Sequence, residues 1–213
     1  PIVQAGERII LSVDDGVVHY WGKIHSEEEG AAARVAAQRI RGVRRVEDHR
    51  LETRKRPADD YGPQIRRASE RGQSKQGWVD SYHSFSFGNF YDPAYMGYGP
   101  LRAINDKFVQ PAKGSTTYGL CDVEIITYVL DGALGHDNSL DDSTVLSAGD
   151  VQCMSAGSGV RFSEANRDPS EVTHYLQIWI EPDSIGQPAS YAHQHFPSES
   201  KRGRLRAIAS SDA

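Results

Sequence analysis

The segment VEIITYVLDG, residues 123–132, decides the fold class of this chain. Its run of apolar, largely β-branched residues is typical of a strand, and the Asp131-Gly132 pair that ends it predicts a tight turn. Two similar units follow: residues 144–146 before Ala148-Gly149-Asp150, and residues 175–180 before Glu181-Pro182. Many short strands separated by turn signals predict an all-β sandwich or barrel from residue 64 onward.

The first fifty residues follow a different pattern. Residues 8–13 and 17–21 are strand-like, and Asp14-Asp15-Gly16 predicts the turn between them. Ser26 and Glu29 form a capping box at the start of an alanine-rich helix that ends at Gly42. Apolar side chains occur along this helix at helical spacing: Ala32, Val35, Ala36 and Ile40. A strand around 43–51 completes a β-β-α-β order.

This β-β-α-β segment resembles a BON domain, a small module associated with envelope, lipid or ligand binding. The matching residues are the strand at 15–18, Gly22, Ser26, the helix and the segment 42–46. We therefore predict a small α/β, BON-like domain over 1–52, with a purely structural α/β cap as the alternative. The charged, proline-containing segment TRKRPADDYGP, residues 53–63, predicts a linker.

From residue 64 the chain resembles the pirin family of the cupin superfamily. The matching segments follow in family order: 65–72, 77–87, 91–93, 96–97, 101–106, 123–132, 154–159 and 177–180. The resemblance implies a mainly β fold, with a cupin (jelly-roll type) barrel over 64–198. Family members usually carry two barrels, so it also implies that residues 199–213 are the first strand of a missing second barrel. A natural short form and a trimmed chain both fit this expectation.

The resemblance also implies a metal site of imidazoles and one carboxylate. At its four positions this chain carries Tyr118, Leu120, Phe162 and Glu164. Leu120 and Phe162 offer no ligand atom, and a tyrosine binds a metal only when it is deprotonated. We therefore predict no metal or other cofactor, with the Tyr118 hydroxyl as the partner of Glu164 and with Glu124 in the pocket wall. Either a ligand binds there without metal, or the side chains themselves fill the pocket.

Three functions stay open. The favoured one is a non-enzymatic binding or regulatory protein with an unidentified protein or small-molecule partner, and the second is a metal-dependent quercetin-type dioxygenase. The third is a redox sensor that uses Cys121 or Cys153, although Asp122 should raise the pKa of Cys121 and Cys153 falls in a predicted core strand. We expect surface or structural roles for five histidines: His83, His136, His174, His193 and His195.

Composition and charge limit the classes of protein to which the chain can belong. The 213 residues are 38% hydrophobic without a membrane-spanning run, and two cysteines cannot build a disulfide scaffold. A net charge of −5 does not predict a nucleic-acid surface. We expect a cytoplasmic location; because the chain begins at Pro1, a periplasmic one with envelope contact through the BON-like part stays open. Uncovered sheet edges predict a homodimer.

Overall fold

The protein is described by a computed structural model that covers residues 9–14, 17–22, 27–40, 42–48, 65–92, 94–140 and 143–210. The chain divides into two compact units, Pro1–Glu70 and Arg71–Ala213. The predicted linker at 53–63 lies outside the described residues. The boundary between the units falls shortly after residue 64, where we expected the barrel to begin.

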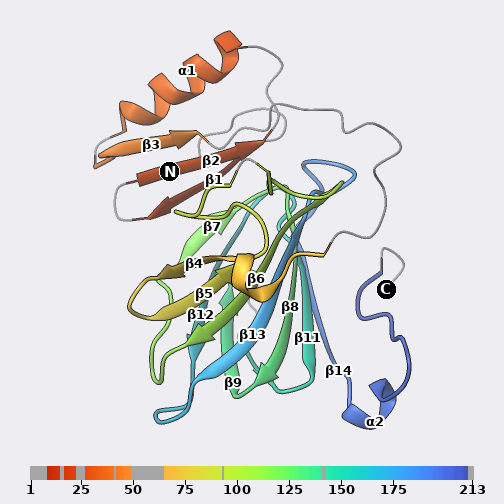
Figure 1. Cartoon of the computed structure of the whole chain (residues 1–213). Coiled ribbons are helices and arrows are strands. Elements are labelled where there is room, and N and C mark those ends of the chain that lie inside the picture. Colours follow the sequence, from red (N-terminus) through yellow and green to blue (C-terminus); the bar gives the residue numbers. More distant parts are fainter. Residues whose placement is uncertain are drawn as a thin grey trace. The chain divides into compact units, whose positions relative to one another are not determined.

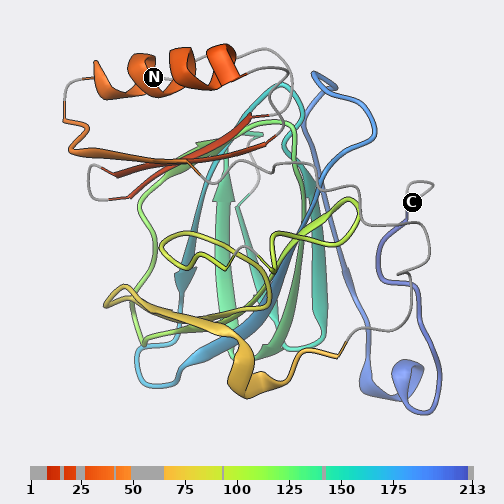
Figure 2. The same cartoon turned by 45° about the horizontal axis from the view of Figure 1, so that its top comes forward.

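The described part of the first unit contains a three-stranded sheet in the order β1-β2-β3. β1 (Ile9–Asp14) pairs antiparallel with β2 (Val17–Gly22), and β3 (Arg45–Asp48) pairs parallel with β2. Helix α1 (Glu27–Gln38) connects the two parallel strands and lies across one face of the sheet (Figure 2). The predicted β-β-α-β order is therefore present. Val35 on α1 is 46% exposed, so the expected apolar stripe is not buried there.

The second unit is a β-barrel of two antiparallel sheets (Figure 1). Within its described residues the larger sheet has the order β14-β11-β8-β13-β6-β5-β4, and the smaller one has the order β10-β9-β12-β7. The larger sheet consists of β4 (Gly72–Lys75), β5 (Val79–His83), β6 (Leu101–Val109), β8 (Glu124–Asp131), β11 (Asp150–Ser155), β13 (Thr173–Ile180) and β14 (Ser190–His195). The smaller sheet consists of β7 (Tyr118–Leu120), β9 (Ala133–Asn138), β10 (Ser143–Ser147) and β12 (Val160–Asn166). The mainly β, cupin-type prediction is confirmed.

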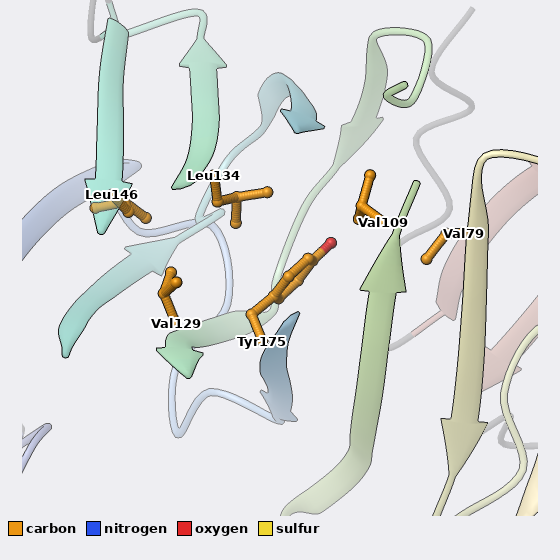
Figure 3. Close-up of a cluster of buried hydrophobic side chains, with 6 residues drawn as sticks. All are labelled: Val79, Val109, Val129, Leu134, Leu146 and Tyr175. Carbon is orange, nitrogen blue, oxygen red and sulfur yellow. The ribbon is translucent and has the colours of Figure 1, made fainter. Parts of the chain in front are cut away.

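Strand alternation builds the interior of the barrel. Successive side chains of a strand point to opposite faces, and β6, β8, β12 and β13 each bury every second residue along most of their length. Part of the interior is apolar, and six buried side chains form one cluster (Figure 3): Val79, Val109, Val129, Leu134, Leu146 and Tyr175. Burial of one such side chain contributes about 1.5–3 kcal/mol to stability.

After β14 the chain returns along the outside of the larger sheet. Helix α2 (Ser198–Lys201) brings the Lys201 ammonium 2.7 Å from the Tyr128 hydroxyl, and further on the Ile208 carbonyl lies 4.0 Å from Cys153 Sγ. Residues 204–210 contain no strand, so the first strand of a second barrel, expected in 199–213, is not formed in this described part. No helix in the described ranges is long and apolar enough to cross a membrane.

Candidate functional site

The four positions that the family resemblance singled out share the inner face of the smaller sheet. Tyr118 and Leu120 lie two residues apart on β7, and Phe162 and Glu164 lie two residues apart on β12, so the side chains of each pair point to the same face. Pairing of β7 with β12 sets Tyr118 directly opposite Phe162, and their ring centroids lie 4.4 Å apart. Leu120, Phe162 and Glu164 are buried, and Glu164 has no exposed surface. These four side chains therefore share one inward face of the smaller sheet.

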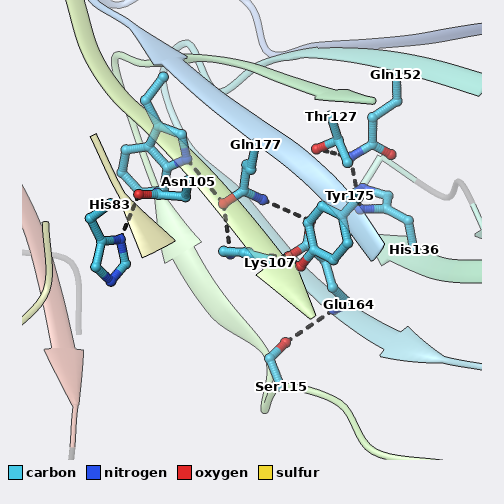
Figure 4. Close-up of polar contacts among 11 residues, drawn as sticks. His83, Asn105, Lys107, Ser115, Thr127, His136, Gln152, Glu164, Tyr175 and Gln177 are labelled. Atoms are coloured by element: carbon cyan, nitrogen blue, oxygen red, sulfur yellow. Dashed lines mark hydrogen bonds and ion pairs between the residues drawn. The ribbon is translucent and has the colours of Figure 1, made fainter. Parts of the chain in front are cut away.

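The partners of Glu164 differ from the prediction. The Tyr175 hydroxyl donates to Glu164 Oε2 over 2.9 Å, and Gln177 Nε2 donates to Oε1 over 2.8 Å (Figure 4). Both donors come from β13 in the opposite sheet, so the predicted bond from Tyr118 is wrong. The ammonium of Lys107 on β6 lies 3.7 Å from Glu164 Oε2. The carboxylate is thus held by two neutral donors and one nearby cation.

Burial and the charge of Glu164 control the ionisation of its neighbours. Desolvation, followed by the charge of Glu164, raises the pKa values of Tyr118 and Tyr175 well above 10.0. Both phenols therefore keep their protons at neutral pH. Burial lowers the pKa of Lys107, and the attraction of Glu164 opposes that shift.

A second group of polar side chains lies beside this cluster. His136 on β9 stands opposite Glu164 in the strand register, and its ring stacks on Phe162 at 5.5 Å and on Tyr191 at 5.1 Å. The amide nitrogen of Gln152 lies 3.4 Å from His136 Nδ1 and 3.3 Å from the Thr127 hydroxyl. His136 is fully buried, which fits the structural role expected for it.

A third polar group connects β4, β5 and β6. His83 Nδ1 lies 2.7 Å from Asn105 Oδ1, and His83 Nε2 lies 2.8 Å from the Ser74 hydroxyl. Because Asn105 Oδ1 can only accept, His83 carries its proton on Nδ1, and Nε2 accepts from Ser74. Burial lowers the pKa of His83, with a smaller contribution in the same direction from Lys107. His83 is thus a buried neutral histidine, in agreement with its predicted structural role.

The side chains at the four positions do not fit a metal centre of the three-imidazole type. Leu120 and Phe162 have no donor atom, and the Tyr118 phenol stays protonated, so Glu164 alone offers ligand atoms. His136 is the imidazole next to Glu164, and its ring is stacked between two aromatic rings. In the described ranges no group of three or more His, Cys, Asp or Glu side chains is arranged to hold a metal ion.

Three other predicted residues lie away from this cluster. Glu124 alternates with the inward-facing Ile125 on β8 and accepts a hydrogen bond from Ser155, so it is not in the inner wall.

Cys121 and Cys153 are free and partly buried. Burial raises both pKa values, helped by Asp122 for Cys121 and by Glu124 for Cys153. This shift works against a thiol sensor. His193 and His195, for which we expected surface or structural roles, belong to β14 of the larger sheet.

Sequence reasoning missed the polar residues of the larger sheet that face Glu164. Asn105 and Lys107 share the inward face of β6 with Ala103 and Val109, and Tyr175 and Gln177 share the inward face of β13 with Thr173 and Trp179. All are buried. The available signal was the period of two in LRAINDKFV: a polar residue at an inward position of a core strand is unusual and marks a site.

A family profile and several known proteins match the barrel part of the chain. The profile of the Pirin family matches residues 64–180. A quercetin 2,3-dioxygenase of Escherichia coli K12 is 44% identical over 132 residues, which cover 62% of this chain and 57% of that protein. A pirin-like protein of Caulobacter vibrioides is 44% identical over 139 residues, or 65% of this chain and 60% of that protein. The chain therefore matches less than two thirds of the length of these relatives.

Two solved structures also superimpose on this chain. The crystal structure of YhhW from Escherichia coli superimposes with a TM-score of 0.61 and 39% identity, over 67% of this chain and 65% of that one. A second structure, of YhhW in complex with nickel(II), gives a TM-score of 0.60 over 67% and 66% of the two chains.

These findings correct our functional prediction. We favoured a non-enzymatic binding or regulatory protein, but relatives at 44% identity bear the name of a dioxygenase and contradict that choice. They favour the alternative that we had ranked second. Since the family profile covers more than half of the chain and ends within β13, the chain belongs to the pirin family of the cupin superfamily.

Proposed function

We propose that this chain takes part in quercetin 2,3-dioxygenase-type oxidation of hydroxylated aromatic compounds. The observation that supports it most is the 44% identity, over 132 residues, to the dioxygenase of Escherichia coli. The barrel interior also contains an oriented carboxylate, Glu164, whose oxygens accept hydrogen bonds from Tyr175 and Gln177.

In this proposal the Glu164 carboxylate takes the hydroxyl proton of the substrate, and the electron pair of the O–H bond stays on the substrate as an oxyanion. Tyr175 and Gln177 fix the direction of its carboxylate, since one donates to each oxygen. The apolar side chains of Leu120 and Phe162 are buried on the same sheet face as Glu164, and this low-dielectric surrounding strengthens its polar contacts. No step of this proposal uses a metal ion, because the residues at the four family positions do not fit one.

Quercetin turnover tests the proposal. The purified chain is mixed with quercetin in air, and the loss of quercetin absorbance is followed together with oxygen uptake. The assay is run on protein treated with a chelator and on protein supplied with iron(II) or nickel(II). We expect equal molar consumption of quercetin and oxygen, at a rate at least tenfold lower in Glu164→Gln because a glutamine amide cannot take up the proton.

The matched control is Glu124→Gln, on the outer face of β8, which should keep the wild-type rate. When the reaction runs under oxygen gas labelled with oxygen-18, each product molecule should contain two labelled oxygen atoms. Absence of quercetin loss under every metal condition would contradict the proposal, and so would a Glu164→Gln variant that turns over at the wild-type rate.

We further propose that residues 1–52 act as a BON-like ligand- or envelope-binding module. We also propose that the chain is a cytoplasmic protein and that it forms homodimers. The β-β-α-β order of the first unit supports the module. Light scattering of the full chain tests the dimer, for which we expect twice the mass of 23.5 kDa. Sedimentation with lipid vesicles tests the envelope contact.

A further inference from the structure

Strand β14 forms one edge of the larger sheet (Figure 1). Its one neighbour among the described strands is β11. Five of the six residues Ser190–His195 are exposed, and they include residues on both faces of the strand. An edge of this kind presents main-chain N–H and C=O groups with which a further strand can pair.

The hydrogen-bond pattern identifies the open groups of β14. The N–H of Phe196 donates to the Gly149 carbonyl over 2.9 Å, in the same register as the pairing of β14 with β11. Neighbouring residues of an antiparallel strand bond to opposite sides, so the even-numbered residues of β14 bond to β11. His193 and His195 therefore point their main-chain N–H and C=O groups away from β11, to the open edge.

This edge lacks the features that usually protect an edge strand. The sequence SYAHQH contains no lysine, proline or acidic residue, and its register with β11 is continuous. The opposite edge of the same sheet differs, because β4 has only four residues and one of them is Lys75. Of these two edges, β14 is therefore the one suited to pairing with a further strand.

The segment after β14 does not fill this edge within the described residues. Lys201 contacts Tyr128 on β8, and the Ile208 carbonyl lies 4.0 Å from Cys153 Sγ on β11. Tyr128 and Cys153 lie between inward-facing residues of their strands, so both contacts are on the outer face of the sheet. The side chain of Leu205, between these contacts, is fully exposed.

A second copy of β14 matches the open groups. Antiparallel pairing about a two-fold axis at Gln194 places His193 opposite His195 of the second copy, so that each open N–H meets an open C=O. The two Gln194 side chains then face each other across the axis. Both are uncharged amides, which can donate and accept hydrogen bonds.

Charges beside the strand favour the antiparallel orientation. The segment KRGRLR, residues 201–206, follows β14 and contains the exposed Arg202 and Arg204. The loop that precedes β14 contains the exposed Asp183, and its Gly186 N–H is bound to Asp122 over 2.7 Å. An antiparallel pair sets the basic end of one copy beside the acidic end of the other. A parallel pair would set like charges beside each other.

We propose that β14 is a dimerisation edge: two copies of the chain pair their β14 strands antiparallel about Gln194 and join their larger sheets into one continuous sheet. The inference rests on the homodimer proposed above and names its interface. It is independent of the proposed oxidation. Because a contact along one strand is smaller than the interface of a permanent dimer, the dimer fraction should rise with protein concentration.

Disulfide trapping of the full chain tests the register. Gln194→Cys is made together with Cys121→Ser and Cys153→Ser, so that no other thiol is present. Directly opposite residues have Cβ atoms about 4.5–5.5 Å apart, and the closest of these spacings suits a disulfide. We expect diamide to convert most of this variant to a covalent dimer. The control Val145→Cys, exposed on β10, should stay monomeric, and equal trapping of the two would overturn the interface.

Two further variants test the edge by sedimentation velocity over a range of protein concentrations. His193→Pro removes an edge-facing N–H and keeps the bonds to β11, and Gln194→Lys sets two like charges opposite each other. We expect each to raise the dimer dissociation constant at least about tenfold. Gln73→Pro, at an edge-facing N–H of β4, is the matched control and should dimerise as the wild type does. Circular dichroism checks that each variant is folded.

The outcomes separate the interface from the dimer itself. Weaker dimers in both β14 variants, with trapping of the Gln194→Cys variant, support the inference. A dimer that persists unchanged in both variants and is not trapped overturns the inference and leaves the homodimer standing. A wild-type chain that sediments as a 23.5 kDa monomer at every concentration overturns both. Quercetin turnover is measured separately, so its failure leaves the interface standing.

Discussion

The hydroxyl of Tyr175 on β13 donates a 2.9 Å hydrogen bond to Glu164 on β12, and this bond joins the two sheets of the barrel. The two residues are fully buried and lie 11 positions apart in the chain. The bond therefore contributes to both the stability of the barrel and the orientation of the carboxylate.

Tyr175→Phe should destabilise the protein by about 1–3 kcal/mol, because it removes one donor from a buried carboxylate and keeps the ring. Urea unfolding measures the change. Tyr98→Phe, at a tyrosine that is 37% exposed, is the matched control and should change stability by less than about 0.5 kcal/mol. A Tyr175→Phe variant as stable as this control would show that the hydrogen bond is dispensable.

Lys107→Met should cost about 3–5 kcal/mol, because Glu164 then loses the cation beside it and remains buried. The double variant Lys107→Met/Glu164→Gln should recover part of that loss, since no charge is left unpaired. Arg167→Met removes an ion pair with Asp137 whose side chains are each 48% exposed, and it should cost less than about 1 kcal/mol. A double variant less stable than Lys107→Met would contradict the charge-balance argument.

Phe162→Ala should cost about 3–5 kcal/mol, because it empties a fully packed position between the rings of Tyr118 and His136. Thermal unfolding monitors the effect. Val145→Ala on β10 of the same sheet is 55% exposed and serves as the control, with a change within about 0.5 kcal/mol. Similar losses in the two variants would mean that the interior around Phe162 is not closely packed.

Acid should destabilise the fold through His83. Burial lowers its pKa below the ordinary value of 6.5, so below that pH the unfolded chain binds a proton that the folded chain does not. The stability that this residue contributes is complete above pH 6.5 and is lost as pH falls through the lowered pKa. Urea unfolding from pH 8 to pH 5 should show a loss in the wild type that is smaller in His83→Gln. Parallel curves for the two proteins would rule out this coupling.

The sequence predicted features that depend on neighbouring residues, such as strands and turns, better than contacts between distant strands. Runs of strand-forming residues and turn signals predicted the strands of the barrel, and the family resemblance pointed to the positions of Tyr118, Leu120, Phe162 and Glu164. The partner of Glu164 could not be predicted in this way, because Tyr175 and Gln177 reach it from the opposite sheet. Glu124 was misplaced because its strand parity, opposite to the buried Ile125, was not applied.

The segment after β14 shows a second limit. The family resemblance implied a strand within residues 199–213, but a segment does not form a strand without a pairing edge. In the structure Cys153 on β11 meets the Ile208 carbonyl through its side chain, and β11 already pairs with β8 and β14. No edge of β11 is left for this segment.

Native Cys121 and Cys153 should react slowly with thiol reagents. Burial raises both pKa values above 9.0, so the thiolate fraction at pH 7.5 is small, and thiolate is the reactive form. Iodoacetamide labelling followed by mass spectrometry should proceed at least about tenfold more slowly in the native protein than in urea, where both the pKa shift and the shielding disappear. Peroxide should likewise leave both thiols reduced. Rapid native modification of either cysteine, absent in its Cys→Ser variant, would restore the redox-sensor alternative.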